Sequence, residues 1–105
     1  MTNSLPKYKL YIDSEFIEHA SKEYIASDNP FTGQPWCLIP QGTIEDTDRA
    51  VQAAQKAFKS GEWPRLNGSQ RGELLNNLAN LMQQNASELG EVEVRDNGKL
   101  FIEMK

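Results

Sequence analysis

The sequence predicts a mixed α/β fold in which short strands come first and about three α-helices follow. Three observations favour this order. Before Gly42, aromatic and β-branched residues form short runs between turn residues. After Gly42, apolar residues recur with helical spacing, and residues that cap helices separate the helical stretches. We therefore divide the 105 residues into β-hairpins and turns over residues 1–41 and helices over residues 42–105.

The N-terminal segments read as paired strands. The run from Tyr8 to Ile12, a two-residue Asp-Ser step and a second run over residues 15–17 predict a β-hairpin, although Asp-Ser is weaker turn chemistry than Asp-Gly. Residues 23–26 are a candidate for a further strand. Residues 29–35, NPFTGQP, predict a turn. Residues 36–39 then predict a short buried strand that ends at Pro40.

The first predicted helix begins after Thr43, an N-cap residue with Asp46 three residues later, and it ends at Gly61. The crowded acids Glu45, Asp46 and Asp48 are better explained by the helix dipole than as a catalytic carboxylate pair. Its predicted buried face consists of Ala50, Val51, Ala54, Ala57 and Phe58. After the connector at residues 63–66, Asn67 or Ser69 is expected to cap the second helix.

The second helix carries a stripe with the spacing of a buried face: Leu74, Leu75, Leu78, Leu81 and Met82. Asn85 is expected to cap a third helix, with Glu88 completing a capping box. Gly98 is expected to end that helix in the left-handed conformation. Residues 100–102 begin a further apolar element.

Composition narrows the function classes. A chain of 105 residues fits one domain at most, and its net charge of −4 argues against a nucleic-acid partner. No apolar run approaches the roughly 18 residues that a membrane span needs. The N-terminal sequence also lacks the features of a signal peptide. A single cysteine excludes an internal disulfide and favours a reducing compartment, so we expect a soluble cytoplasmic protein.

Residues that could carry chemistry are few. Cys37 lies in an apolar run without a nearby base, which favours an inert core thiol over a nucleophile. His19 lies in a polar stretch and is interpreted as a surface imidazole; a small thiol enzyme built on both residues is the less favoured alternative. Arg71 is expected to form a solvated or structural ion pair, with Glu73, Glu88 or a group outside these 105 residues as the candidate partner. Glycine-rich phosphate-binding loops are absent from the sequence.

Taken together, the motifs resemble the N-terminal part of the NAD(P)-dependent aldehyde dehydrogenase superfamily. Their order and spacing carry the resemblance more than any one of them. Two positions depart from the family pattern: Ser14 stands where Gly is usual, and Leu100 stands where Pro is usual. The matching motifs are residues 10–16, 29–33, 39–43, 45–51, 53–54, 57–58, 63–66, 71–75, 78–81, 85–86, 88–89 and 96–99.

The resemblance implies an α/β fold with a Rossmann-type cofactor domain, of which residues 1–105 would be an incomplete N-terminal part. It implies an oxidoreductase that converts an aldehyde to a carboxylic acid with NAD or NADP. In the family, a Cys thiolate attacks the aldehyde, hydride passes to the nicotinamide, and a water activated by Glu hydrolyses the thioester. A homo-dimer or homo-tetramer is implied for the full-length enzyme.

The family's catalytic and cofactor-binding residues lie downstream of the motif at residues 96–99, and Cys37 does not match the catalytic Cys. The resemblance therefore assigns no catalytic and no cofactor-binding residue to this chain. Some members hold a structural monovalent cation. Two of its usual ligands would correspond here to the Asp96 carboxylate and the Asp28 backbone carbonyl, and the third would come from sequence outside these 105 residues. Oxygen atoms suit such a hard cation.

We therefore expect a fragment of an aldehyde dehydrogenase that, alone, binds no cofactor and has no dehydrogenase activity. The alternative is a stand-alone, non-catalytic helical scaffold or interaction module that has kept the outer layer of the fold. The scaffold should unfold cooperatively, whereas the fragment should be loose or oligomerising because its apolar faces lack a sheet.

Overall fold

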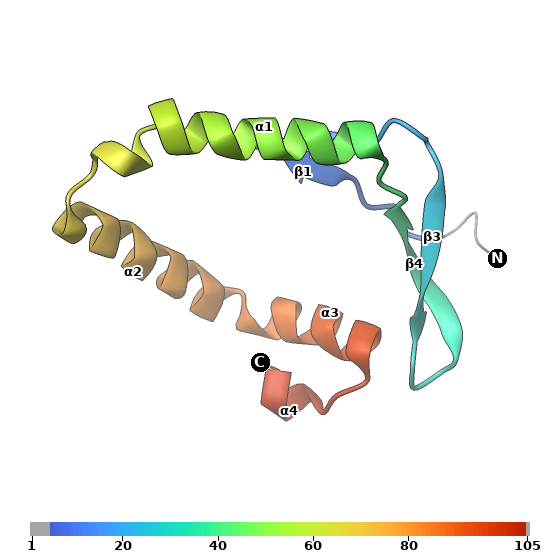
Figure 1. The fold of residues 1–105 in the computed structure, drawn as a ribbon. Coiled ribbons are helices and arrows are strands. Elements are labelled where there is room, and N and C mark those ends of the chain that lie inside the picture. Colours follow the sequence, from blue (N-terminus) through green and yellow to red (C-terminus); the bar gives the residue numbers. More distant parts are fainter. Residues whose placement is uncertain (1–4, 105) are drawn as a thin grey trace.

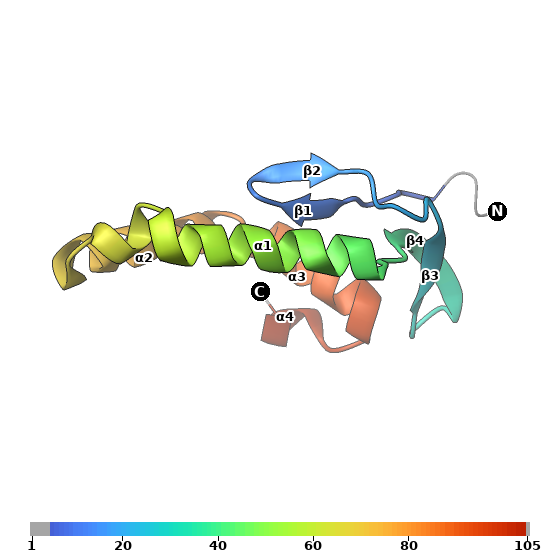
Figure 2. The same ribbon diagram turned by 45° about the horizontal axis from the view of Figure 1, so that its top comes forward.

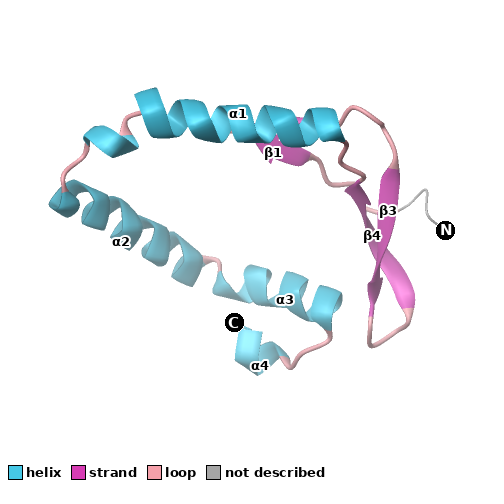
Figure 3. Ribbon diagram, in the orientation of Figure 1, coloured by secondary structure: helices cyan, strands magenta, loops and turns pink. Residues whose placement is uncertain are grey.

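The computed structural model describes residues 5–104. The predicted strand part (1–41) and helix part (42–105) also include residues 1–4 and 105, which lie outside the described residues. The strands come before the helices, as predicted (Figure 3). Figure 1 shows an open frame in which α1 (Ile44–Ser60) and α2 (Gly68–Gln84) run along two sides. The antiparallel pair β3 (Tyr24–Asn29) and β4 (Gln34–Pro40) lies at the opposite end from the turn that joins these helices.

The predicted N-terminal hairpin is confirmed. β1 (Leu10–Ile12) pairs with β2 (Glu15–Ile17), and the pair lies alongside α1 (Figure 2). Both turn residues adopt the left-handed conformation, with φ values of 54° at Asp13 and 63° at Ser14. Two consecutive positive φ angles match the right-handed twist of the strands, and the hairpin keeps this turn geometry although Ser14 stands at a position that favours Gly. Tyr11 and Phe16 face each other across the strands with ring centroids 4.9 Å apart.

The second hairpin is longer than expected, because β3 continues to Asn29 and β4 includes Pro40. The predicted turn between them is confirmed, with Gly33 at φ 70° and its N–H bonded to the Asn29 carbonyl at 2.8 Å. The prediction of a buried strand at residues 36–39 is only partly right. Cys37 is buried, but its neighbours are half-buried or exposed, because the described residues form a sheet of only two strands here.

The helix caps follow the sequence closely. Thr43 and Asp46 form the predicted capping box of α1, and Asn67 caps α2 with Gln70. The capping box expected for α3 (Ala86–Asn97) is wrong: the Asn85 amide instead donates 2.8 Å to the Leu81 carbonyl at the end of α2. The connector contains a 3-10 turn, η2 (Trp63–Arg65), and the last apolar element is the short helix α4 (Phe101–Met104). Within residues 5–104, no helix has the length and apolar character that a membrane crossing requires.

The predicted buried faces of the helices are exposed. Val51 and Phe58 of α1 face solvent, and the five apolar residues of the α2 stripe are 47–57% exposed. The helices do not form a common core: α1 packs mainly on η2 and β1, and α2 packs mainly on α3. The radius of gyration is 17.2 Å, against about 13 Å for a compact domain of this length. Helical spacing identifies the apolar side of each helix, but the prediction that this side is buried is wrong for the described chain.

Replacing Gly98 with Ala should destabilise the junction between α3 and the β3–β4 turn. Gly98 has φ 75°, and a Cβ there would lie 3.1 Å from the Pro30 Cβ. Left-handed backbone alone costs about 1–2 kcal/mol for a residue with a Cβ. We expect a lower urea midpoint when helix circular dichroism is followed. The control Gly72→Ala lies in α2 with open space around it and should raise stability by roughly 1 kcal/mol. A shift of the same sign in both variants would contradict this reading.

Candidate functional site

Asp96, in the last turn of α3, lies against the β3–β4 sheet. Its carboxylate accepts hydrogen bonds from the Ser27 hydroxyl of β3 and from the Trp36 indole N–H of β4, the latter at 3.3 Å. The Trp36 ring also meets Tyr8 edge-on, with centroids 6.4 Å apart. These contacts join α3 to the sheet across about sixty residues of sequence, so Asp96 fixes the position of α3.

The two predicted cation ligands are therefore brought to the same region. Asp28 follows Ser27 directly at an irregularity in the β3–β4 register, and its side chain is exposed. The described side-chain partners of Asp96 are Ser27 and Trp36, and Asp28 is not among them. Carboxylate and hydroxyl oxygens suit a hard cation. No group of three or more His, Cys, Asp or Glu side chains within residues 5–104 is arranged to hold a metal ion.

Cys37 pairs with Ser27 in the β3–β4 ladder and is 2% exposed. Burial raises the pKa of its thiol, and the negative charge of Asp96 raises it further. A thiol with a raised pKa stays protonated near neutral pH, whereas a nucleophile needs the thiolate. The environment of Cys37 is thus that of a structural cysteine, in agreement with the sequence interpretation.

His19 is not the surface imidazole that the sequence suggested, because it is 1% exposed. Its Nε2 donates to the Glu23 carbonyl, and its ring meets Tyr24 edge-on at a centroid distance of 4.9 Å. Nδ1 is buried without a hydrogen-bond partner. No described hydrogen bond joins His19 to Cys37, so the geometry offers no base for the thiol. The sequence contained one signal of this burial. His19 lies two residues after Ile17, and alternate residues of an extended segment face the same side.

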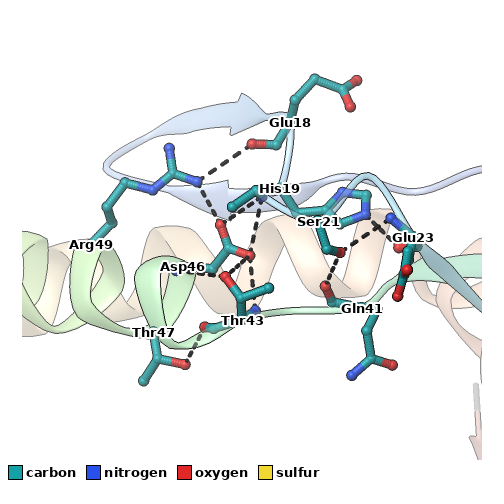
Figure 4. Close-up of polar contacts among 10 residues, drawn as sticks. Glu18, His19, Ser21, Glu23, Gln41, Thr43, Asp46, Thr47 and Arg49 are labelled. Atoms are coloured by element: carbon teal, nitrogen blue, oxygen red, sulfur yellow. Dashed lines mark hydrogen bonds and ion pairs between the residues drawn. The ribbon is translucent and has the colours of Figure 1, made fainter.

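Asp46 is the buried carboxylate that sequence reasoning assigned only to a helix cap. Figure 4 shows it between Thr43 and Arg49. It accepts the predicted cap bond from the Thr43 N–H at 3.0 Å and an ion-paired bond from Arg49 at 2.6 Å. The Ala20 N–H also donates to both carboxylate oxygens, at 3.1 and 3.3 Å. Arg49 in turn donates 3.4 Å to the Glu18 carbonyl, so α1 holds the β2–β3 connection through Asp46 and Arg49 together.

The electrostatics of Asp46 reflect these contacts. Burial by itself raises its pKa. The hydrogen bonds from Arg49, Thr43 and Ala20 outweigh that effect and lower the pKa to about 2. The carboxylate is therefore ionised throughout the physiological range. These bonds tie the start of α1 to Ala20 in the β2–β3 connection, and this indicates a structural joint. Asp48 is separate, because it accepts from Gln52 at 2.7 Å within α1.

The described residues do not fit a dinucleotide cofactor. The groove beside Trp36 is lined by the carboxylates of Glu88, Glu93 and Asp96, which would repel phosphates. The N-termini of α1 and α2 are occupied by their own capping side chains rather than open to an anion. Arg71 forms no ion pair with Glu73 or Glu88 within the described part of the chain. Nothing in this arrangement supplies a nucleophile, a base and a phosphate site together.

Comparison with known proteins gives a consistent result. The model of the aldehyde dehydrogenase family matches residues 16–105. Mitochondrial 10-formyltetrahydrofolate dehydrogenase of Mus musculus is 39% identical over 96% of this chain and 11% of its own length. Aldehyde dehydrogenase family 2 member C4 of Arabidopsis thaliana is 41% identical over 89% of this chain and 19% of its own length.

Among solved structures, the NAD-dependent aldehyde dehydrogenase from Sinorhizobium meliloti superposes with a TM-score of 0.88 at 30% identity. The match covers 95% of this chain and 20% of that enzyme. The chain thus spans a fifth or less of the length of the relatives it matches, and the open frame of strands and helices is also present in a longer polypeptide.

Proposed function

Because the chain belongs to the aldehyde dehydrogenase family, we propose that residues 1–105 form the N-terminal strand-and-helix part of the cofactor-binding domain of such an enzyme. The family oxidises aldehydes. The observation that carries the proposal is the family match over residues 16–105, supported by the superposition on a solved enzyme of the family. The boundary between strands at 1–41 and helices at 42–105 is part of the proposal.

For the longer enzyme we propose oxidation of an aldehyde to a carboxylic acid with NAD or NADP through a Cys thioester, in a homo-dimer or homo-tetramer. The S. meliloti relative is described as NAD-dependent, which favours this cofactor class. No step of the reaction is assigned to the described residues of this chain, because the carboxylates in the groove beside Trp36 would repel the phosphates of a dinucleotide. A cytoplasmic location, and the absence of nucleic-acid and membrane partners, remain predictions.

The 105-residue chain on its own should not oxidise aldehydes. The support is the chemistry of its residues: the raised pKa of Cys37, the buried His19 and the carboxylate-lined groove beside Trp36. The test is NADH formation by the purified chain with a panel of aldehydes, compared with the Cys37→Ser variant. We expect neither protein to exceed the buffer background. Aldehyde-dependent NADH formation that Cys37→Ser abolishes would instead establish the thiol-enzyme alternative.

We also propose that Asp96 and the Asp28 carbonyl contribute to a monovalent cation site. The support is that Asp96 lies against Ser27, the neighbour of Asp28. Sodium chloride, compared with choline chloride at equal ionic strength, should shift the NMR signals of the Trp36 indole and the Asp28 region. Asp96→Asn should remove the sodium-specific shift, and Asp48→Asn should keep it. Equal shifts with both salts would show ordinary screening instead.

A further inference from the structure

The largest unexplained feature of the chain is the apolar stripe of α2. We call it the α2 face and define it as Leu74, Leu75, Leu78, Leu81 and Met82. Each of these side chains is about half exposed. The α2 face continues onto α3, since Met82, Leu89 and Val92 line one groove. In Figure 1 these two helices follow one another along one side of the open frame.

The exposed area indicates a large missing contact. The chain exposes 8490 Å², whereas a compact protein of 11.9 kDa exposes about 5,900 Å², an excess of roughly 2,500 Å². A standard protein interface covers about 800 Å² on each partner. An ordinary dimer of this chain would therefore leave most of the excess uncovered. The area fits a partner that wraps several elements, as the remainder of a domain does.

The charge pattern of α2 leads to the same conclusion. Its charged residues are Arg71 and Glu73, both near its start, and none follows up to Gln84. The side opposite the α2 face carries amides, among them Asn76 and Asn80. A helix that stays in solvent usually has a charged outer side. Depletion of charge is typical of the centre of an interface.

We propose that the α2 face, with Leu89 and Val92, docks onto the polypeptide that supplies the rest of an aldehyde dehydrogenase fold. In the S. meliloti enzyme the same backbone arrangement is a fifth of a chain whose other four-fifths are available to cover it. A second copy of this chain is disfavoured by the area and by the mutual repulsion of two −4 charges. The inference rests on the proposed function, since it names the partner of the same segment.

The test uses the S. meliloti enzyme expressed without the segment that this chain matches. It is co-expressed with the tagged 105-residue chain, and purified material is analysed by size-exclusion chromatography with mass determination. We expect a 1:1 complex. Leu78→Glu places a charge in the middle of the α2 face and should abolish co-purification. Asn76→Glu places the same charge on the opposite side of α2 and should leave it intact.

A single-chain hybrid removes any dependence on the solubility of two pieces. In it, this chain replaces the matching segment of the S. meliloti enzyme. The hybrid should be soluble, its Leu78→Glu variant should be lost to the insoluble fraction, and its Asn76→Glu variant should remain soluble. Circular dichroism of the isolated variants should show unchanged helix content, which locates the effect in docking and not in the folding of α2.

The outcomes separate docking from catalysis. A stable complex without NADH formation supports the docking surface and counts against the proposed function. A complex that tolerates Leu78→Glu, or an insoluble hybrid with the unmodified chain, overturns the docking proposal. A third outcome also overturns it: the chain captures no enzyme fragment and instead forms a dimer that Leu78→Glu dissociates. The α2 face would then serve self-association.

Discussion

Replacing Asp46 with Asn should release the β2–β3 connection from α1. The carboxylate accepts from Ala20, Thr43 and Arg49 at once, and an amide of the same shape has only one oxygen. In the variant, a backbone N–H must face an N–H₂ group, and Arg49 loses its charged partner. We expect amide hydrogen exchange at Ala20 to become at least roughly tenfold faster, since hydrogen bonds to charged groups are the stronger ones.

The matched control is Asp48→Asn, two residues further along α1. Asp48 bonds to Gln52 within the same helix and holds no other element. Its replacement should leave exchange at Ala20 unchanged. Equal acceleration in both variants would mean that the helix start as a whole, and not the Asp46 contact, protects the Ala20 amide.

The same carboxylate should produce a pH dependence in the acid range. The folded pKa of Asp46 is about 2, below its ordinary value of 3.8. Its contribution to stability is therefore complete above about pH 4 and is lost as the pH falls through about 2. The Ala20 amide proton shift should titrate with a midpoint of about 2 in the intact chain and should not titrate in Asp46→Asn. A midpoint near 3.8 would contradict the contacts described here.

The second large effect concerns Leu78→Ala, which should lower the unfolding free energy much more in the hybrid enzyme than in the isolated chain. In the isolated chain Leu78 is 52% exposed, so its truncation should lower the unfolding free energy by less than about 1 kcal/mol. In the hybrid with the S. meliloti enzyme the same side chain should be covered. There the truncation should cost about 2–5 kcal/mol, the usual range for a buried Leu. Denaturant unfolding of both proteins measures the difference.

Asn80→Ala is the control, because it replaces a residue on the opposite side of α2 and should have similar small effects in both settings. If Leu78→Ala costs several kcal/mol in the isolated chain as well, the α2 face is already covered in solution. A second copy of the chain would then be the partner to examine.

Much of the local structure was predictable because its causes lie within a few residues. The Thr43–Asp46 box, the positive φ of Gly98 and the hairpin turn at Asp13 and Ser14 all depend on neighbours at short range. The capping box expected at Asn85 failed for a local reason too. Only Asn85 separates the end of α2 from the start of α3, and its side chain bonds back to Leu81 instead of forward.

The candidate site was less predictable because its contacts span long stretches of sequence. Ala20 and Asp46 are 26 residues apart, and Ser27 and Asp96 are 69 apart. No periodicity or motif specifies such pairs. The burial of His19 was missed for a different reason: its contacts with Glu23 and Tyr24 are local, but the surrounding residues of its own segment are polar.

The sequence by itself determined the order of strands and helices, their caps and the family, because these depend on local preferences and on motifs in series. Only the tertiary structure showed that Asp46 is a joint between elements and that the α2 face stays uncovered. The physical reason is that a helical stripe records which side of a helix avoids water. What covers that side depends on polypeptide that is distant in sequence, and the described elements leave about 2,500 Å² more surface exposed than a compact protein of this mass does.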